Sequence, residues 1–192
     1  MKYSIILLNY DPENKKPWIA DTRKAIEENS QGYEYELIEV RDVKGYVNAV
    51  NEGFARATGD YLIVCNDDIV IQDKEWLPKL TSPNSIVSYA YQQFYLTKLL
   101  LPDASCFGLS RKTQKVIGDM DIAFENGYGC DDIDYFYRAL EAGINTERAD
   151  VGIRHLENQT YKMYFGGNKS DMTEKNVGIF YDKWKEKLNL PV

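Results

Sequence analysis

The stretch that decides the fold runs from Tyr61 to Asp68 and reads Tyr-Leu-Ile-Val-Cys-Asn-Asp-Asp. Its first five residues form a continuous apolar run, which predicts a strand buried on both faces. Asn66, Asp67 and Asp68 follow at the carboxyl end of that strand, where open α/β sheets bind their ligands. Such oxygen ligands suit Mg²⁺ or Mn²⁺ carrying a phosphate, but Asn and Asp are also common turn residues. The stretch alone leaves a metal site and a structural turn both open.

Strands and helices alternate regularly before this stretch. Apolar runs at 4–8 and 36–40 predict two further buried strands, and helices are expected over about 18–29 and 46–57. A β-α-β-α-β order of this kind implies a parallel sheet with right-handed crossovers. The sequence therefore predicts an α/β fold with a mostly parallel, Rossmann-like central sheet flanked by helices.

The second half of the chain is less regular, and the segment 92–102 fits no single element. No internal repeat or low-complexity linker divides the chain, so one domain over residues 1–192 is expected. Trp184 lies in an amphipathic C-terminal helix, which we interpret as core packing. The elements expected here are strands at 85–89, 106–109 and 147–153 and helices at 111–118, 131–142 and about 171–190.

Composition excludes several classes of function. The net charge is −7, so the basic surface that a general nucleic-acid binder needs is not expected. No apolar stretch approaches the roughly 20 residues of a membrane span, so no transmembrane segment is expected. The three cysteines, Cys65, Cys106 and Cys130, are far apart and odd in number. They favour free thiols in a reducing compartment, and hence a cytoplasmic protein.

A second acidic cluster opens the helix expected at 131–142. Asp131, Asp132 and Asp134 crowd its first turn, behind the glycines at 127 and 129. Asp is favoured at helix N-termini, so a capping role alone would account for one of them. Three carboxylates in four residues exceed what capping needs. A base that accepts a proton from a substrate hydroxyl is the functional alternative.

The single histidine, His155, follows the strand expected at 147–153. A lone histidine is commonly an ordinary hydrogen-bonded residue. At a strand end, a neutral imidazole could instead complete a mixed nitrogen and oxygen metal site with Asp68.

Several further motifs occur in a fixed order along residues 3–160. They are the opening strand and loop at 4–11, Asn51-Glu52-Gly53, Gly59-Asp60-Tyr61, the Asp-x-Asp position at 66–68, and the acidic helix from Gly127 to Gly143 with Arg138 before its end. In this order they resemble the inverting family 2 glycosyltransferases of the GT-A fold. The chain departs from that pattern at 40–44, which lacks the usual Asp-Asp-Gly-Ser, and Asp131 stands where the family usually has Glu.

The resemblance implies a role for each matching residue. Asp132 corresponds to the general base with Asp131 beside it, and Asp68 and His155 correspond to the metal ligands for Mn²⁺ or Mg²⁺. The contacts that it implies to the donor come from Asn9, Tyr10, Asp11, Asp42, Asn51, Asn66 and Asp67.

The function implied is metal-dependent, inverting transfer of a sugar from a nucleoside-diphosphate sugar, with UDP-sugar expected. The acceptor would be a hydroxyl of a glycan, a lipid-linked sugar or another molecule. The donor half would be about 1–100 and the acceptor half about 101–170. One alternative is a non-catalytic nucleotide- or sugar-binding module on the same fold. Another is a nucleotidyltransferase, although the chain lacks a glycine-rich basic loop after its first strand.

The segment 157–171 combines aromatic, cationic and glycine residues that would suit a lid over the donor. An ordinary surface loop is the alternative. The residues concerned are Tyr161, Lys162, Tyr164, Gly166, Gly167 and Lys169.

Overall fold

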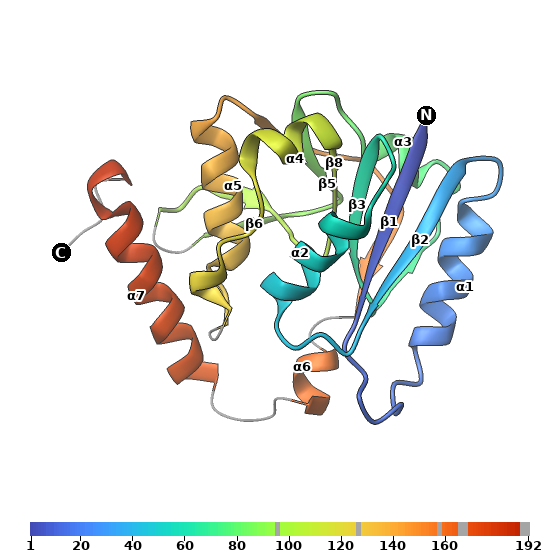
Figure 1. The fold of residues 1–192 in the computed structure, drawn as a ribbon, viewed down its shortest axis with the longest axis horizontal. Helices are drawn as coiled ribbons and strands as arrows, with labels where there is room; N and C mark the ends of the chain where they lie inside the picture. Colours follow the sequence, from blue (N-terminus) through green and yellow to red (C-terminus); the bar gives the residue numbers. More distant parts are fainter. Residues whose placement is uncertain (95–96, 126–127, 157–158, 165–168, 189–192) are drawn as a thin grey trace.

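The computed structural model describes the chain except residues 95–96, 126–127, 157–158, 165–168 and 189–192. Its centre is a six-stranded sheet (Figure 1). Most neighbouring strands are parallel, but β8 runs antiparallel to both β3 and β5. The strands lie in the order β2 (Glu34–Arg41), β1 (Lys2–Asn9), β3 (Tyr61–Asn66), β8 (Cys106–Ser110), β5 (Ser85–Ser88) and β9 (Asn145–Arg148).

Alternation along β1 divides the core into two layers. Ile6 and Leu8 point to one face of the sheet, whereas Ile5 and Leu7 point to the other, as successive strand residues must. All four side chains are buried. The apolar run therefore supports helices on both faces, which is the predicted α/β architecture.

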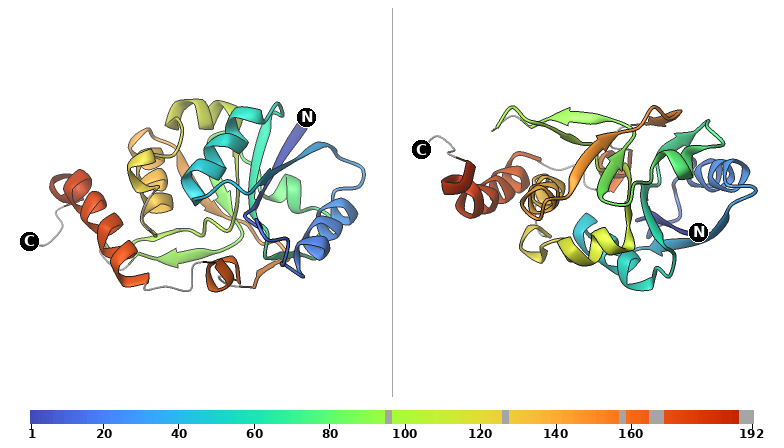
Figure 2. Two further views of the ribbon diagram at one scale, coloured as in Figure 1. Left: turned by 60° about the horizontal axis from the view of Figure 1, so that its bottom comes forward. Right: turned by 90° about the horizontal axis from the view of Figure 1, so that it is seen from above.

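The helices form a layer on each face (Figure 2). On the face of Ile6 lie α2 (Tyr46–Arg56), α4 (Arg111–Ile117) and α5 (Asp131–Glu141), with α7 (Lys169–Leu188) packed outside them. On the other face lie α1 (Ile19–Asn29) and α3 (Trp76–Lys79). Trp184 of α7 is 2% exposed, which confirms the predicted packing role.

Short elements absent from the sequence prediction complete the fold. The ambiguous segment 92–102 contributes to a hairpin of β6 (Tyr91–Gln93) and β7 (Leu100–Pro102). A 3₁₀ turn, η1 (Ile122–Phe124), precedes α5, and α6 (Gln159–Tyr164) lies near the carboxyl ends of β1 and β3 (Figure 1). No helix in the described ranges has the length and apolar character needed to cross a membrane.

The single strand predicted at 147–153 is wrong. The chain instead leaves the main sheet after β9 and forms a separate strand, β10 (Ile153–His155). β10 pairs antiparallel with β4 (Ile69–Ile71), directly after the Asp67-Asp68 turn. The apolar pattern of the sequence could not reveal that β9 and β10 pair with different strands. A strand shows the same alternation of side chains whichever strand it pairs with. The change has a consequence for function, since it sets His155 opposite Ile69.

Candidate active site

A cleft of about 1010 Å³ opens at the carboxyl ends of β1 and β3. Segments far apart in the sequence meet there: the end of β1, the turn after β3, the start of α5 and the end of β10. Among the predicted site residues, three lie outside its lining, namely Asp11, Asp42 and Asn51. Those that do line it are Asn9, Tyr10, Asn66, Asp67, Asp68, Asp131, Asp132 and His155.

Asp68 and His155 form a pair at one end of the cleft. The Nε2 atom of His155 lies 2.9 Å from Oδ1 of Asp68, and the backbone N–H of Gln159 donates to the other carboxylate oxygen at 3.1 Å. Burial by itself would raise the pKa of Asp68, but these hydrogen bonds outweigh it and leave the pKa lowered. Asp68 is thus held as an anion at neutral pH.

The pair fits a divalent metal. A carboxylate oxygen and an imidazole nitrogen converge there, a donor set that suits Mn²⁺. Within the described residues no group of three or more His, Cys, Asp or Glu side chains could hold a metal. Such a metal would therefore take its remaining ligands from water and from a diphosphate, as Mg²⁺-type sites commonly do.

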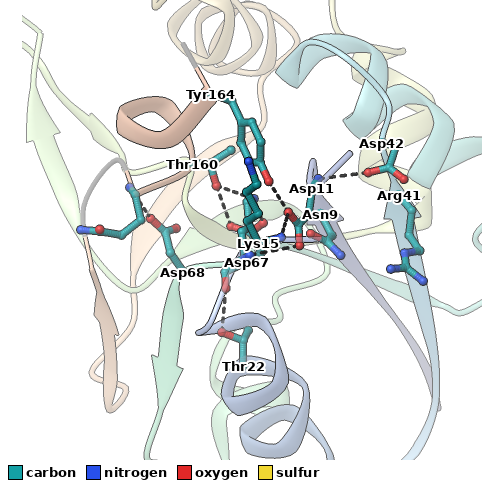
Figure 3. A network of polar contacts seen from close by, with 12 residues as sticks. Asn9, Asp11, Lys15, Thr22, Arg41, Asp42, Asp67, Asp68, Thr160 and Tyr164 are labelled. Carbon is teal, nitrogen blue, oxygen red and sulfur yellow. Dashed lines mark hydrogen bonds and ion pairs between the residues drawn. The ribbon is translucent and has the colours of Figure 1, made fainter. Parts of the chain in front are cut away.

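Asp67 lines the same cleft but has a different set of partners from Asp68. Its carboxylate forms an ion pair with Lys16 and accepts a hydrogen bond from Thr160 Oγ1 at 2.9 Å (Figure 3). Its backbone carbonyl accepts from Thr22 Oγ1 of α1 at 2.7 Å. The sequence reasoning missed Lys16 entirely, because a lysine in a polar loop carries no sign of burial.

Asp11 organises the loop after β1. It accepts hydrogen bonds from the backbone N–H groups of Lys15 and Lys16 and from the hydroxyl of Tyr164 in α6 (Figure 3). Its own N–H donates to Oδ1 of Asp42 at 3.0 Å. Asp11 and Asp42 therefore shape the wall behind the cleft and join β1, β2 and α6.

Asn9 and Tyr10 contribute the wall itself. Asn9 is 1% exposed, and its side-chain Nδ2 donates to Glu39 at 2.6 Å. Its Oδ1 is buried and has no hydrogen-bond partner within the described structure. The ring of Tyr10 meets that of Tyr164 edge to face, with 5.6 Å between centroids.

The Asn51-Glu52-Gly53 motif packs rather than lining the cleft. The Asn51 amide exchanges two hydrogen bonds with the backbone of Met120, at 3.0 and 2.8 Å. A Cβ atom on Gly53 would lie 2.2 Å from Cγ2 of Ile6, so the glycine lets α2 approach β1 closely. The side chain of Asn51 therefore lies outside the lining of the cleft, where the predicted contact with the donor would be made.

The start of α5 supplies the acidic end of the cleft. Asp131 and Asp132 are half-buried, and Gln92 of β6 donates to Asp132 Oδ2 at 3.1 Å. Burial, with the negative charge of Asp131 added, raises the pKa of Asp132 to about 7. Burial likewise raises the pKa of Asp131 to about 6. A helix N-terminus favours nearby anions, but burial and the neighbouring carboxylates outweigh that effect on the pKa values of Asp131 and Asp132.

Asp134 belongs to the core and not to the cleft. It is fully buried and forms ion pairs with Arg138 at 2.9 Å and Lys183 at 2.8 Å. It also accepts a hydrogen bond from Nε1 of Trp184 at 2.9 Å. The third carboxylate of the acidic cluster therefore anchors α7 against α5.

The lid predicted at 157–171 lies partly outside the described residues, which include neither Gly166 nor Gly167. Within the described part, α6 carries Thr160 and Tyr164 onto the loop after β1 and the turn after β3 (Figure 3). Its position beside the donor residues agrees with a covering element, but closure stays a prediction.

Several solved structures with a similar fold are glycosyltransferases. The catalytic domain of Drosophila β1,4-galactosyltransferase 7, solved with xylobiose, has a TM-score of 0.64 and 17% identity, covering 91% of this chain and 80% of its own. Glucosyl-3-phosphoglycerate synthase from Mycobacterium tuberculosis, with Mn²⁺, UDP and phosphoglyceric acid, scores 0.62 at 16% identity, covering 100% and 80%. The Pyrobaculum calidifontis mannosyltransferase, with GDP-Man and Mn²⁺, scores 0.61 at 14% identity, covering 93% and 69%. No curated protein sequence matches the chain significantly.

The chain shares the GT-A fold of these glycosyltransferases. Residues 13–84 match the model of Glycosyl transferase family 2, and this match with the shared fold confirms the predicted resemblance. The matched segment contains Asn66, Asp67 and Asp68. It ends before Asp132 and His155, whose roles rest on the geometry described above.

Proposed function

We propose that this protein is a metal-dependent inverting glycosyltransferase that uses a nucleoside-diphosphate sugar, preferentially a UDP-sugar. The observation that carries the proposal is that the Asp68–His155 pair and Asp132 line the same cleft. These are the two groups that the reaction needs, one for the leaving diphosphate and one for the acceptor proton. The Mn²⁺ and the UDP or GDP-Man in the neighbouring structures support the same assignment.

At the donor end, Asp68 and His155 would hold the metal. When bound, Mn²⁺ or Mg²⁺ supplies positive charge that stabilises the leaving diphosphate. Asn9 and Tyr10 line the cleft, and we place the nucleobase against the aromatic ring of Tyr10. Asn66 lines the cleft between these groups, where we place the ribose.

At the acceptor end, Asp132 takes the proton of the acceptor hydroxyl. The acceptor oxygen forms a bond to the sugar C1 while the bond from C1 to the phosphate oxygen breaks, and attack from the opposite face inverts C1. Gln92 donates to one oxygen of Asp132 and thereby orients the carboxylate. A raised pKa makes Asp132 a stronger base than an ordinary aspartate.

Activity should therefore rise with pH around neutrality. Asp132 must be ionised to accept a proton, and its pKa is raised to about 7. We expect kcat/KM to fall about tenfold per pH unit below that value. A pH–rate profile at a saturating concentration of Mn²⁺ checks this. A profile that stays flat down to about pH 5 would show that the pKa of the catalytic base is not raised to about 7.

Stability should change in the opposite direction. The unfolded carboxyl group loses its proton at about pH 4, whereas the folded group keeps its proton to about pH 7. The folded state therefore binds more protons in this window, and the contribution of Asp132 to the free energy of unfolding decreases as pH rises through it.

The acceptor should be an uncharged sugar. Asp103 and Asp131 lie near Asp132, the proposed base, and the charge of each helps to raise its pKa. An anionic acceptor would be repelled there. Among the neighbours, one was solved with xylobiose and another with phosphoglyceric acid, and this charge pattern favours the former kind of acceptor.

A transfer assay tests this function. UDP- and GDP-sugars are incubated with Mn²⁺ and either a neutral glycoside or its uronic-acid counterpart, and products are identified by mass spectrometry. We expect transfer from a UDP-sugar to the neutral acceptor, at least about tenfold faster than to the acid. Failure of every donor to react, with or without acceptor, would contradict the proposed function. Preference for the acid would contradict only the acceptor assignment.

A further inference from the structure

Lys16 is a buried cation beside the metal-binding turn. Its side chain is 0% exposed, and its Nζ atom forms an ion pair with Asp67, whose side chain is 3% exposed. Nζ also donates to Thr160 Oγ1 at 2.6 Å. The rings of Trp18 and Tyr164 each have their centroid 5.9 Å from it.

Both carboxylate oxygens of Asp67 have a partner. Oδ2 faces Lys16, and Oδ1 accepts from Thr160. Removing a buried charged partner leaves the other charge uncompensated, which costs several kcal/mol in typical proteins. The contact therefore holds the Asp67 carboxylate firmly in one orientation.

Asp68 is held differently, although it is the next residue. Its oxygens face the imidazole of His155 and the backbone N–H of Gln159, and neither contact is with a lysine or arginine. The two neighbouring carboxylates thus have different environments. Both side chains are almost fully buried, and both residues line the cleft. The carboxylate of Asp67 is paired with a buried lysine, whereas that of Asp68 is paired with an imidazole and a backbone N–H group.

We propose that Lys16 is a positioning residue that keeps the carboxylate of Asp67 out of the metal's coordination shell, so that the turn offers one carboxylate ligand, Asp68. Asn66 replaces the first acid of the Asp-x-Asp motif, and Lys16 engages the middle one. This inference rests on the proposed function, because it concerns the metal that the donor site would hold.

Binding of Mn²⁺ itself tests the inference without any activity measurement. Free Mn²⁺ is followed by electron paramagnetic resonance, with and without UDP, for the wild type, Lys16→Met, Lys16→Arg and Asp67→Asn. We expect Asp67→Asn to weaken Mn²⁺ binding by no more than about threefold, through the loss of one nearby negative charge. Lys16→Met should tighten it about tenfold, because a nearby positive charge is lost and Asp67 becomes free to bind. Lys16→Arg should stay near the wild type, and adding Asp67→Asn to Lys16→Met should remove the gain.

Two results would overturn the inference. One is a loss of about tenfold in Mn²⁺ affinity in Asp67→Asn alone, which would make Asp67 a ligand. The other is unchanged or weaker Mn²⁺ binding in a folded Lys16→Met. If Lys16→Met fails to fold, Asp67→Asn decides alone. Failure of the wild type to bind any UDP or UDP-sugar would contradict the proposed function. The order of the Mn²⁺ affinities among the variants would still test the role of Lys16.

Discussion

Replacing Asp132 with Asn should lower sugar transfer by about 10³-fold while leaving donor affinity within about twofold of the wild type. The amide keeps the size of the side chain and its contact with Gln92, but it cannot take a proton from the acceptor. The Asp132 carboxylate is contacted by Gln92 and by the backbone N–H of Ile133, neither of which belongs to the Asp68–His155 pair, so we expect the donor site to remain intact. Initial rates with a UDP-sugar, together with calorimetric titration of UDP, measure both quantities.

The same replacement should stabilise the protein. Burial raises the pKa of Asp132, so its ionised form is held at a cost that Asn avoids. We expect the melting temperature at about pH 8 to rise by roughly 2–4 °C and to be nearly unchanged at about pH 4. Asp182→Asn, on the exposed side of α7, is the matched control and should change neither rate nor stability. Normal transfer by Asp132→Asn would show that the base is another group.

Replacing Asp68 with Ala should abolish the dependence of nucleotide binding on Mn²⁺. Asp68 is the carboxylate that faces His155 at 2.9 Å, and its lowered pKa keeps it charged. Without it, a metal would retain a single protein ligand. We expect the affinity for UDP with Mn²⁺ to fall at least about tenfold, to the value measured in EDTA.

Asp73→Ala is the control for this experiment. Asp73 follows β4 in the same region and pairs with Lys79 at 2.7 Å, but it lies outside the lining of the cleft. It should keep the full effect of Mn²⁺. If Asp68→Ala binds UDP with the same gain from Mn²⁺ as the wild type, the metal ligands lie elsewhere.

Much of the fold was predictable, because apolar runs and helical spacing are local signals. The strand at 61–65 and the helix at 131–142 appear as β3 and α5 with only small shifts of their ends. Strand partners are not local, however. The sequence between β9 and β10 has no apolar signal for a change of sheet, yet that change brings His155 to Asp68.

The candidate site could be predicted where the sequence carries more charged residues than capping and turns require. Asp68, Asp132 and His155 all line one cleft, as their positions at element ends suggested. Asp134 and Asn51 could not be told apart from these by residue type, because their partners, Trp184 and the backbone of Met120, are distant in sequence. Lys16 was missed for the same reason, since its burial depends on α6.

The most direct test of the central claim is titration of the wild-type protein with UDP, in Mn²⁺ and again in EDTA, by calorimetry. We expect one saturable site per chain with Mn²⁺ and binding of UDP at least about tenfold weaker in EDTA. Equal binding of UDP in both conditions, or no binding of UDP at all, would contradict a metal-dependent nucleotide-sugar site at Asp68 and His155.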